Sequence, residues 1–159
     1  MKNDQYIDAT DRELLALIQN DARTSLDVLA HAIDASPATV QRRLKRMREN
    51  GVIDREIAVL SPRAVGIPMF FLVLVELERE RGSDLDDFRR TLRDEPAVQQ
   101  AYYITGEADF ALVCAAPDMD AFEDLTRRLF MDRPNVRRFR TSVVMDRTKV
   151  GLDVPVNAK

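Results

Sequence analysis

The sequence predicts an α+β protein of two domains, a small helical domain followed by a domain of alternating strands and helices. Two patterns predict this order: apolar residues recur at helical spacing up to residue 50, and apolar runs of strand length alternate with helical patterns from residue 69. Between them, residues 61–68 (SPRAVGIP) concentrate proline and glycine, as junctions do. We expect an N-terminal domain over 1–60, a linker over 61–68 and a C-terminal domain over 69–159.

Two helices are predicted before residue 35. The first spans Thr10–Asn20, because Thr10 and Glu13 have the spacing of a capping box. Ser25 is the predicted N-cap of the second helix, which ends near Asp34. Each has one buried face of apolar side chains at helical spacing: Leu14, Leu15 and Ile18 in the first, and Leu26, Leu29, Ala30 and Ile33 in the second.

A third helix is predicted over 36–50. Ser36 suits the N-cap, Pro37 suits the first helical position, and Gly51 is a typical residue just past a helix end. Its narrow buried stripe consists of Val40, Leu44 and Met47. A short helix, a tight turn and a proline-capped basic helix form the helix-turn-helix pattern, whose second helix enters the major groove of DNA.

Basic charge is concentrated on this third helix. It holds five basic residues and one acidic residue, although the chain has a formal net charge of −3 and residues 1–35 hold three basic and seven acidic residues. Such a local cluster predicts contact with a polyanion. The alternative is a solvated helix whose arginines pair with neighbouring acids. The residues of the helical region that we expect to meet double-stranded DNA are Ser25, Ser36, Ala38, Thr39, Gln41, Arg42, Arg43, Lys45 and Arg46.

Arg42 is the predicted base reader, because it lies near the exposed N-terminal part of the third helix and arginine binds guanine in bidentate fashion. Gln41 would suit adenine. For the other basic side chains of the helix, phosphate contacts and ion pairs within the domain are alternatives that the residues leave open. These side chains are Arg43, Lys45, Arg46 and Arg48.

Two short apolar runs after Gly51 predict a small hairpin, or wing. Val52-Ile53 and Ile57–Leu60 flank the polar residues 54–56, which would form the turn. We expect Arg55 in this turn to contact phosphate.

The C-terminal domain is predicted to have the order βαββαβ. Its first strand, Met69–Glu78, is apolar on both faces, and Ser83 and Asp118 are the predicted helix N-caps. The other predicted strands are Val98–Ile104, Phe110–Ala116 and Val136–Asp146. This order is that of a ferredoxin-like sheet with both helices on one face. Because the first strand is apolar on both sides, we expect the open face to pack on a second copy, which gives a twofold dimer.

Composition argues against catalysis, metal binding and membrane insertion. Cys114, the only cysteine, lies in an apolar run, and His31, the only histidine, lies in the second helix without a catalytic constellation around it. No cofactor, disulfide or metal site is expected. The N-terminus lacks the apolar core of a signal peptide and the longest apolar run, 69–75, is too short to span a bilayer. We expect a cytoplasmic protein.

Several segments, in their order and spacing, resemble the Lrp/AsnC (leucine-responsive, feast/famine) family of transcriptional regulators. They are IDATDRELLALIQNDARTS, ASPATVQRRLKRMRENGVI, YYITGEADFALVCAAPDM and NVRRFRTSVVMDRTK. Two residues and one segment depart from the family pattern: Thr10, where an apolar residue is usual, Asp34, where glycine is usual, and 54–56, where the wing usually has glycine and tyrosine. Aspartate tolerates a left-handed backbone, so Asp34 suits its turn.

The resemblance implies a winged helix-turn-helix domain joined to a RAM-type effector domain, and a nucleoid-associated prokaryotic regulator that responds to amino acids. It also implies dimers that assemble further to tetramers or octamers. From the residues alone, Gly106 and Asp109 form a Gly-x-x-Asp hairpin turn and nothing more. The resemblance makes this hairpin part of an effector site, with the binding residues Tyr103, Ile104, Thr105, Gly106, Glu107, Asp109 and Thr141.

Two other functions compete with a ligand-responsive regulator. An architectural DNA-binding protein of the same build would ignore small molecules. An enzyme similar to sirohaem decarboxylases would share the fold, but its tetrapyrrole chemistry would favour histidines in the second domain, which has none.

Overall fold

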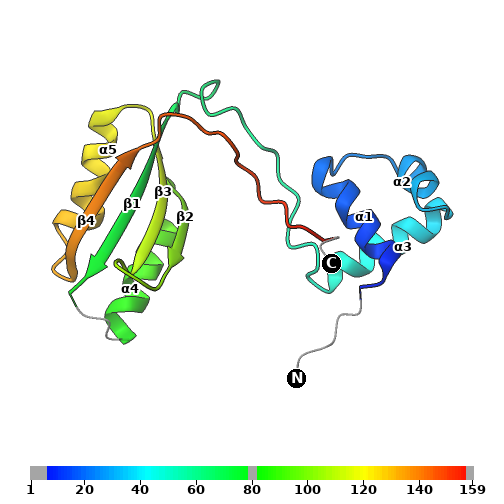
Figure 1. Ribbon diagram of the computed structural model, residues 1–159, viewed down its shortest axis with the longest axis horizontal. Coiled ribbons are helices and arrows are strands. Elements are labelled where there is room, and N and C mark those ends of the chain that lie inside the picture. Colours follow the sequence, from blue (N-terminus) through cyan, green and yellow to red (C-terminus); the bar gives the residue numbers. More distant parts are fainter. Residues whose placement is uncertain (1–6, 79–81, 157–159) are drawn as a thin grey trace. The chain divides into compact units, whose positions relative to one another are not determined.

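The computed structural model describes residues 7–78 and 82–156 (Figure 1). The chain divides into two compact units. One combines the residues up to Val59 with those from Lys149 onward, and the other spans Leu60–Thr148. No helix in the described parts of the chain is long and apolar enough to cross a membrane.

Three helices, α1 (Ala9–Asn20), α2 (Leu26–Ala32) and α3 (Pro37–Glu49), form the first unit around one apolar core. Ser25 and Ser36 cap α2 and α3, as predicted. The buried apolar side chains of the core are Leu14, Leu15, Leu29, Ala30, Val40, Leu44 and Met47. The predicted helix-turn-helix order and the buried stripe of α3 are therefore confirmed.

The start of α1 differs from the prediction. Asp8, not Thr10, is the N-cap: its Oδ1 accepts the backbone N–H of Asp11 at 2.8 Å, and its own N–H donates to Asp11 Oδ2 at 3.3 Å. The pair Thr10 and Glu13 has the same spacing, so spacing could not choose between them. The aspartate pair places Asp11 on the buried face beside Leu14.

Two residues beside these helices adopt a left-handed backbone. Asp34, at φ 50°, follows α2, as its short polar side chain permits. Gly51, at φ 71°, follows α3 in a Schellman motif: its N–H donates to the Arg48 carbonyl at 3.1 Å, and the Val52 N–H donates to the Met47 carbonyl at 2.9 Å. Helix α3 therefore ends as predicted.

The predicted wing strands are wrong, because residues 52–60, all of which are described, contain no strand. Val52 and Ile53 pack against the helical core. Because these two side chains pack on the helices, their backbone does not form the strand pair that was expected with residues 57–60. Of those residues, the large apolar side chains Ile57, Val59 and Leu60 are exposed.

The first unit also contains the end of the chain. Gln19 of α1 exchanges two hydrogen bonds with the backbone of Val154: its Nε2 donates to the carbonyl at 3.1 Å, and its Oε1 accepts the N–H at 2.7 Å. Arg12 Nη1 donates to the carbonyl of Val156 at 2.9 Å. The predicted domain 69–159 is therefore too long, because the residues from Lys149 onward belong to the first unit. Polar side chains of α1 bind the backbone of this segment, and its sequence has no periodic apolar pattern that would have predicted the contact.

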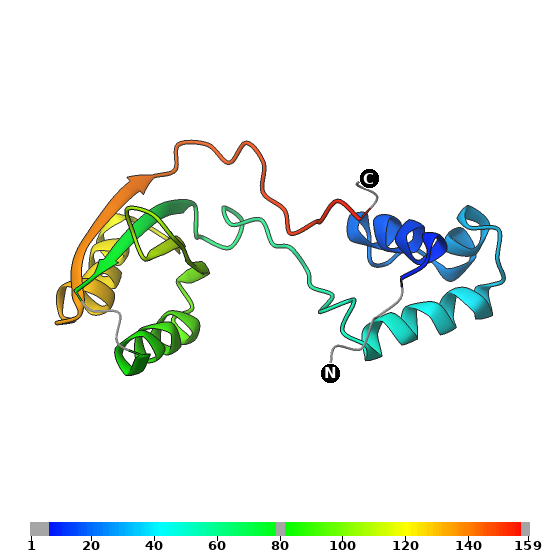
Figure 2. The ribbon, with the colours of Figure 1, turned by 60° about the horizontal axis from the view of Figure 1, so that its bottom comes forward.

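The second unit has the predicted βαββαβ order. Its antiparallel sheet has the strand order β2-β3-β1-β4. Two helices cover one face of this sheet (Figure 2). The elements are β1 (Met69–Leu77), α4 (Gly82–Asp94), β2 (Val98–Tyr103), β3 (Phe110–Ala116), α5 (Met119–Thr126) and β4 (Val136–Val143).

The covered face of the sheet is the core of this unit. Phe71, Val73 and Val75 of β1 are fully buried in it, and Cys114 is buried beside them. Helices α4 and α5 supply the other side, with Phe88, Leu92, Phe122 and Leu125.

Five boundaries in this unit differ from the predictions. Strands β1 and β2 each end one residue earlier than predicted, at Leu77 and Tyr103. Helix α4 begins at Gly82, one residue before the predicted cap Ser83. Helix α5 is capped by Asp118 as predicted but continues as a π-helical turn over Arg127–Met131. Strand β4 ends at Val143 and not at Asp146, because its pairing with β1 ends there.

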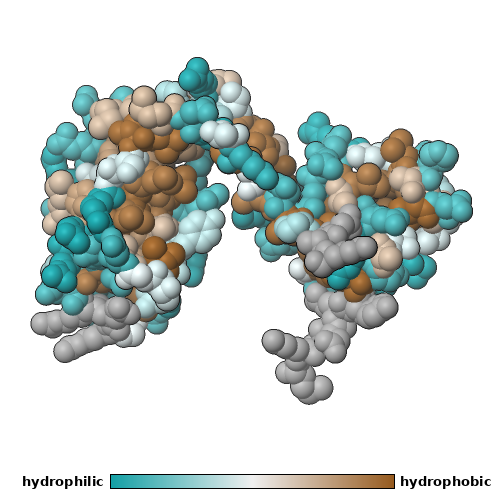
Figure 3. All heavy atoms as spheres, viewed as in Figure 1, coloured by the Kyte–Doolittle hydropathy of each residue, from teal (hydrophilic) through white to brown (hydrophobic). Residues whose placement is uncertain are grey.

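The other face of the sheet is open. Leu72 and Leu74 of β1 are 51% and 37% exposed, and Figure 3 shows apolar residues gathered over the strands of this unit. Phe70 is buried on the same face, with the guanidinium carbon of Arg147 at 4.2 Å from its ring centre. The two apolar faces predicted for the first strand are thus present. That a second copy of the chain covers the open face stays a prediction.

Candidate nucleic-acid interface and effector site

The outer face of α3 presents polar and basic side chains to solvent. Ala38, Gln41, Arg42 and Lys45 are exposed, and Thr39 is half-buried. Arg42 is the basic residue of this helix for which no carboxylate of the described residues lies within ion-pair distance. Its guanidinium is therefore available to a ligand from outside.

Arg43 and Arg46 point toward α1. Arg43 Nη1 donates to Asp8 at 2.6 Å and to Asp11 at 2.9 Å, and Arg46 donates to the second oxygen of Asp11. Asp11 is fully buried, so its charge needs these partners. Hydrogen bonding from Arg43 lowers the pKa of Asp8, and the same bond raises the pKa of Arg43. Of the two alternatives left open, the structure shows ion pairs within the domain for both arginines.

The remaining predicted contacts of this unit are exposed. Lys45 lies 3.7 Å from Glu49, and Arg55 lies 3.7 Å from Asp54, in pairs that water screens. Arg48 pairs with Glu56 at 2.7 Å. The hydroxyls of the other two predicted residues act as helix caps: Ser25 accepts the N–H of Val28, and Ser36 accepts the N–H of Thr39.

The predicted effector hairpin joins β2 to β3. Ile104 donates its N–H to the carbonyl of Asp109 at 2.8 Å, which closes the loop, and Gly106 at its tip has φ 122°, a conformation that favours glycine. Asp109 Oδ2 accepts the backbone N–H of Leu77 at 2.6 Å. The Asp109 carboxylate therefore ties the hairpin to the end of β1. Tyr103 and Thr105 are exposed.

An ion-pair network runs from this hairpin across the open face of the sheet. Glu107 lies 3.5 Å from Arg140, which lies 3.4 Å from Glu76. Arg138 pairs with Glu76 at 2.6 Å, and its hydrogen bond lowers the pKa of Glu76. Glu107 itself is 90% exposed, so its side chain can exchange Arg140 for another cation.

Thr141 lies apart from the hairpin within one chain. It is on β4, paired with Val73 of β1, whereas the hairpin joins β2 and β3 at the opposite side of the sheet. The structure thus brings Tyr103, Ile104 and the turn residues 105–109 together but not Thr141.

Sequence reasoning missed the buried role of Asp11, although a signal was present. Asp11, Leu14, Leu15 and Ile18 have the spacing of one helix face, so the stripe of α1 begins with a carboxylate. A charge in that position needs cationic partners from a neighbouring element, and the arginines of α3 supply them.

Other chemistry has no support in the site. The described residues contain no group of three or more metal-ligating side chains. Burial, with a smaller effect from Glu95, raises the pKa of the Cys114 thiol to about 12, which removes its nucleophilic form at neutral pH.

A helix-turn-helix unit with an exposed basic helix, followed by a separate α+β unit, defines a DNA-binding regulator with a ligand-binding domain. Residues 7–54 match the family model for winged helix-turn-helix DNA-binding domains, and residues 71–153 match that of the Lrp/AsnC ligand binding domain. The chain belongs to the Lrp/AsnC family of transcriptional regulators. Its members are regulators and not enzymes, so the decarboxylase alternative is wrong.

Relatives match along nearly the whole chain. An HTH-type transcriptional regulator of Sinorhizobium fredii is 42% identical over 150 residues, which are 94% of this chain and 89% of that protein. The DNA-binding transcriptional activator DecR of Escherichia coli is 27% identical over 94% of this chain and 99% of its own length.

Solved structures of the same build include two with L-methionine. A transcriptional regulator of Neisseria meningitidis in complex with L-methionine has a TM-score of 0.89 at 27% identity, covering 96% of this chain and 98% of its own. A feast or famine regulatory protein of Mycobacterium tuberculosis complexed with L-methionine has a TM-score of 0.83 at 27% identity, covering 94% and 99%.

Proposed function

We propose that this regulator binds DNA in a sequence-specific way through α3, with Arg42 as the base reader. This proposal depends on a difference between the arginines of α3. Buried Asp11 binds Arg43 and Arg46, whereas Arg42 extends into solvent without an acidic partner among the described residues. Exposed Ala38 and Gln41 nearby complete a surface that fits base edges.

Lys45 is the proposed phosphate contact on the same helix, to be compared with the proposed base reader Arg42. Lys45 lies on the exposed side of the same helix, and its ion-pair partner among the described residues, Glu49, is a solvated neighbour one turn away. A lysine that contacts phosphate does so whatever the base sequence of the duplex, so it contributes affinity without sequence preference. Arg55 is proposed for the same role.

A selection from random duplexes provides the preferred site, and affinities for that site and a scrambled duplex are then measured against salt. Arg42→Ala should remove about 1–3 kcal/mol of discrimination, because one guanine contact is lost. Lys45→Ala should weaken both duplexes alike and reduce the salt slope by about 0.9. Arg90→Ala, an exposed arginine of the second unit, is the control. Equal losses on both duplexes for Arg42→Ala would contradict its role.

We further propose that the effector is an amino acid bound at the hairpin 103–109. Glu107 supplies an exposed carboxylate for the ammonium group, since the Asp109 carboxylate already accepts a bond from Leu77. Backbone N–H groups of the turn suit the effector carboxylate. The L-methionine complexes of two structural relatives support this choice of class.

Thermal shift and gel shift with each proteinogenic amino acid test this effector. One or a few should raise the melting temperature and change DNA affinity, and Glu107→Gln should weaken that response. Glu123→Gln is the matched control, because Glu123 also pairs with an exposed arginine at 3.5 Å but lies on α5. No response to any amino acid would favour the architectural alternative.

We propose that the open sheet face pairs two chains into a homodimer, and that dimers assemble further to tetramers or octamers. We also propose that the protein is cytoplasmic and nucleoid-associated. Leu72 lies in the centre of the open sheet face and is 51% exposed. Sedimentation should show that Leu72→Glu dissociates the dimer, since a charge would enter the interface. Met119→Glu places the same charge on a side chain of 50% exposure on α5 and should leave assembly unchanged. A dimer that survives Leu72→Glu would place the interface elsewhere.

A further inference from the structure

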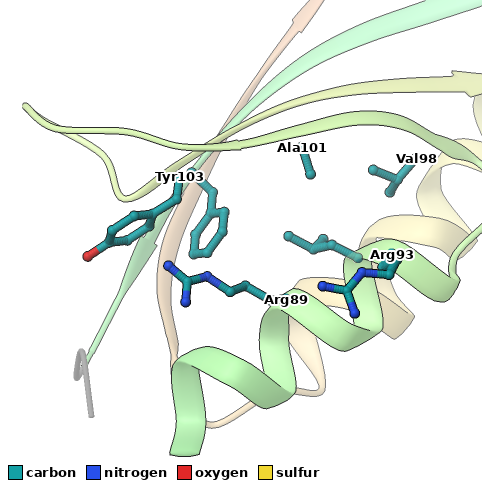
Figure 4. Close-up of a pocket in the computed structure, with 7 residues that line it drawn as sticks. Arg89, Arg93, Val98, Ala101 and Tyr103 are labelled. Atoms are coloured by element: carbon teal, nitrogen blue, oxygen red, sulfur yellow. The ribbon is translucent and has the colours of Figure 1, made fainter. Parts of the chain in front are cut away.

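A cavity of about 380 Å³ lies between α4 and the edge strand β2 (Figure 4). Its volume is within the range of small-molecule sites. Helix α4 lines it from one side and the sheet from the other. The lining residues are Arg89, Leu92, Arg93, Val98, Ala101, Tyr103 and Phe110.

The charge of this cavity has one sign. Among the residues that the structure describes, Arg89 and Arg93 are its charged lining residues, and no aspartate or glutamate of those residues lines it. Arg89 lies 4.9 Å from the ring centre of Tyr103 and 3.3 Å from exposed Asp86, which orients its guanidinium. Arg93 is exposed, and no carboxylate in the described parts of the chain lies within ion-pair distance of it. Arg93 thus offers an uncompensated guanidinium at the cavity.

The floor of the cavity is apolar. Leu92 and Phe110 are both 2% exposed and belong to the core of the unit, so the floor is rigid. The Tyr103 ring packs on Phe110 with centres 5.2 Å apart, and Ala101 leaves room on β2 because its side chain is small. A ligand here can place an apolar group on the floor while a negative group meets the arginines at the mouth.

We propose that this cavity binds a small organic monoanion, a carboxylate with a compact apolar group and no amine, such as a 2-oxo acid. Arg93 receives the carboxylate in the bidentate geometry that guanidinium favours. A zwitterionic amino acid does not fit, because its ammonium group would lie beside two guanidinium groups with no carboxylate among the described lining residues to accept it. The cavity therefore selects the deaminated skeleton.

This site is separate from the amino-acid site proposed at the hairpin. The two share Tyr103, but the cavity depends on α4, and the hairpin site depends on Glu107. A regulator with both would compare an amino acid with an acid of the same carbon skeleton. Each site can fail in experiment without the other, because their charged residues differ.

Isothermal titration of the full-length protein tests the cavity with three probes of one skeleton: 4-methyl-2-oxopentanoate, 4-methylpentanoate and L-leucine. Both amine-free acids should bind wild type and Glu107→Gln alike. Arg93→Gln should weaken them about tenfold or more, because the bidentate contact is lost. Arg90→Gln is the matched control, since Arg90 lies on α4, pairs with Asp87 at 3.3 Å and does not line the cavity.

Ala101→Leu provides a second variant at an exposed position of β2, where it should fill the cavity and abolish binding without touching a charge. Three results would overturn the proposal: no binding of either amine-free acid, binding that Arg93→Gln leaves unchanged, or L-leucine binding as tightly in an Arg93-dependent way. Inorganic phosphate that competes as strongly as the organic acids would also overturn it, since the apolar floor would then have no part.

Discussion

Replacing Asp11 with alanine should destabilise the first unit more than any other single change to a charged residue of α1. Asp11 is fully buried, and it accepts hydrogen bonds from Arg43, from Arg46 and from the backbone N–H of Asp8. The substitution leaves two guanidinium groups without this carboxylate and removes half of the capping box. Arg43 is then left beside α1 with Asp8 as its carboxylate partner.

The loss can be estimated from these contacts. Removing one partner of a buried ion pair costs about 3–5 kcal/mol. Asp8 still binds Arg43 at 2.6 Å, and Arg46 can turn into solvent, so we expect the lower end, about 3 kcal/mol. A unit of this size is stabilised by roughly 4–10 kcal/mol, so the substitution should remove roughly a third to three quarters of its stability.

Urea unfolding followed by circular dichroism at a helical wavelength measures this loss. Glu13→Ala is the matched control, because Glu13 is exposed on the same helix turn and should change stability by about 0.5 kcal/mol or less. Asp11→Asn should lie between the two, since the amide keeps an acceptor but no charge. A loss below about 1 kcal/mol for Asp11→Ala would refute the view that buried Asp11 holds α3.

Three further predictions concern acid, a thiol and the end of the chain. Hydrogen bonding from Arg43, and next from the backbone of Asp11, lowers the pKa of Asp8, so its stabilisation is complete above its ordinary pKa and is lost as pH falls through the lowered value. The thermal destabilisation caused by Asp8→Asn at neutral pH should therefore shrink in strong acid. Cys114 should resist iodoacetamide at mildly alkaline pH until the protein unfolds, because burial raises its pKa to about 12. Gln19→Ala should remove about 0.5–1.5 kcal/mol and speed hydrogen exchange of the Val154 amide, whose acceptor is lost.

Periodicity and capping chemistry predicted most elements, because these signals are local. Val40, Leu44 and Met47 lie four and three residues apart, and they are buried in α3 as the spacing requires. Phe110–Ala116 is a strand with the predicted bounds. Thr10 and Asp8 have equally good capping-box spacing, so the sequence could not identify the N-cap of α1. The burial of Asp11, which depends on the tertiary structure, makes Asp8 the N-cap.

The strands predicted for the wing are absent for a related reason. Val52 and Ile53 have strand-like apolar character, but a hydrophobic side chain can be buried by any surface within reach. The helical core was nearer than a second strand. Pairing along a ladder depends on where the partner lies, and apolar character alone does not report that.

The sequence by itself determined which helix is basic, which stripe of it is apolar and which family the motifs resemble, because these properties depend on residue type and spacing. Only the tertiary structure decided which arginines of that helix remain available. Arg43 and Arg46 differ from Arg42 in no property of composition; they differ because α1 brings a buried carboxylate to one side of α3 and leaves the other side to solvent. Likewise, the cavity at Arg93 exists only because α4 packs beneath β2.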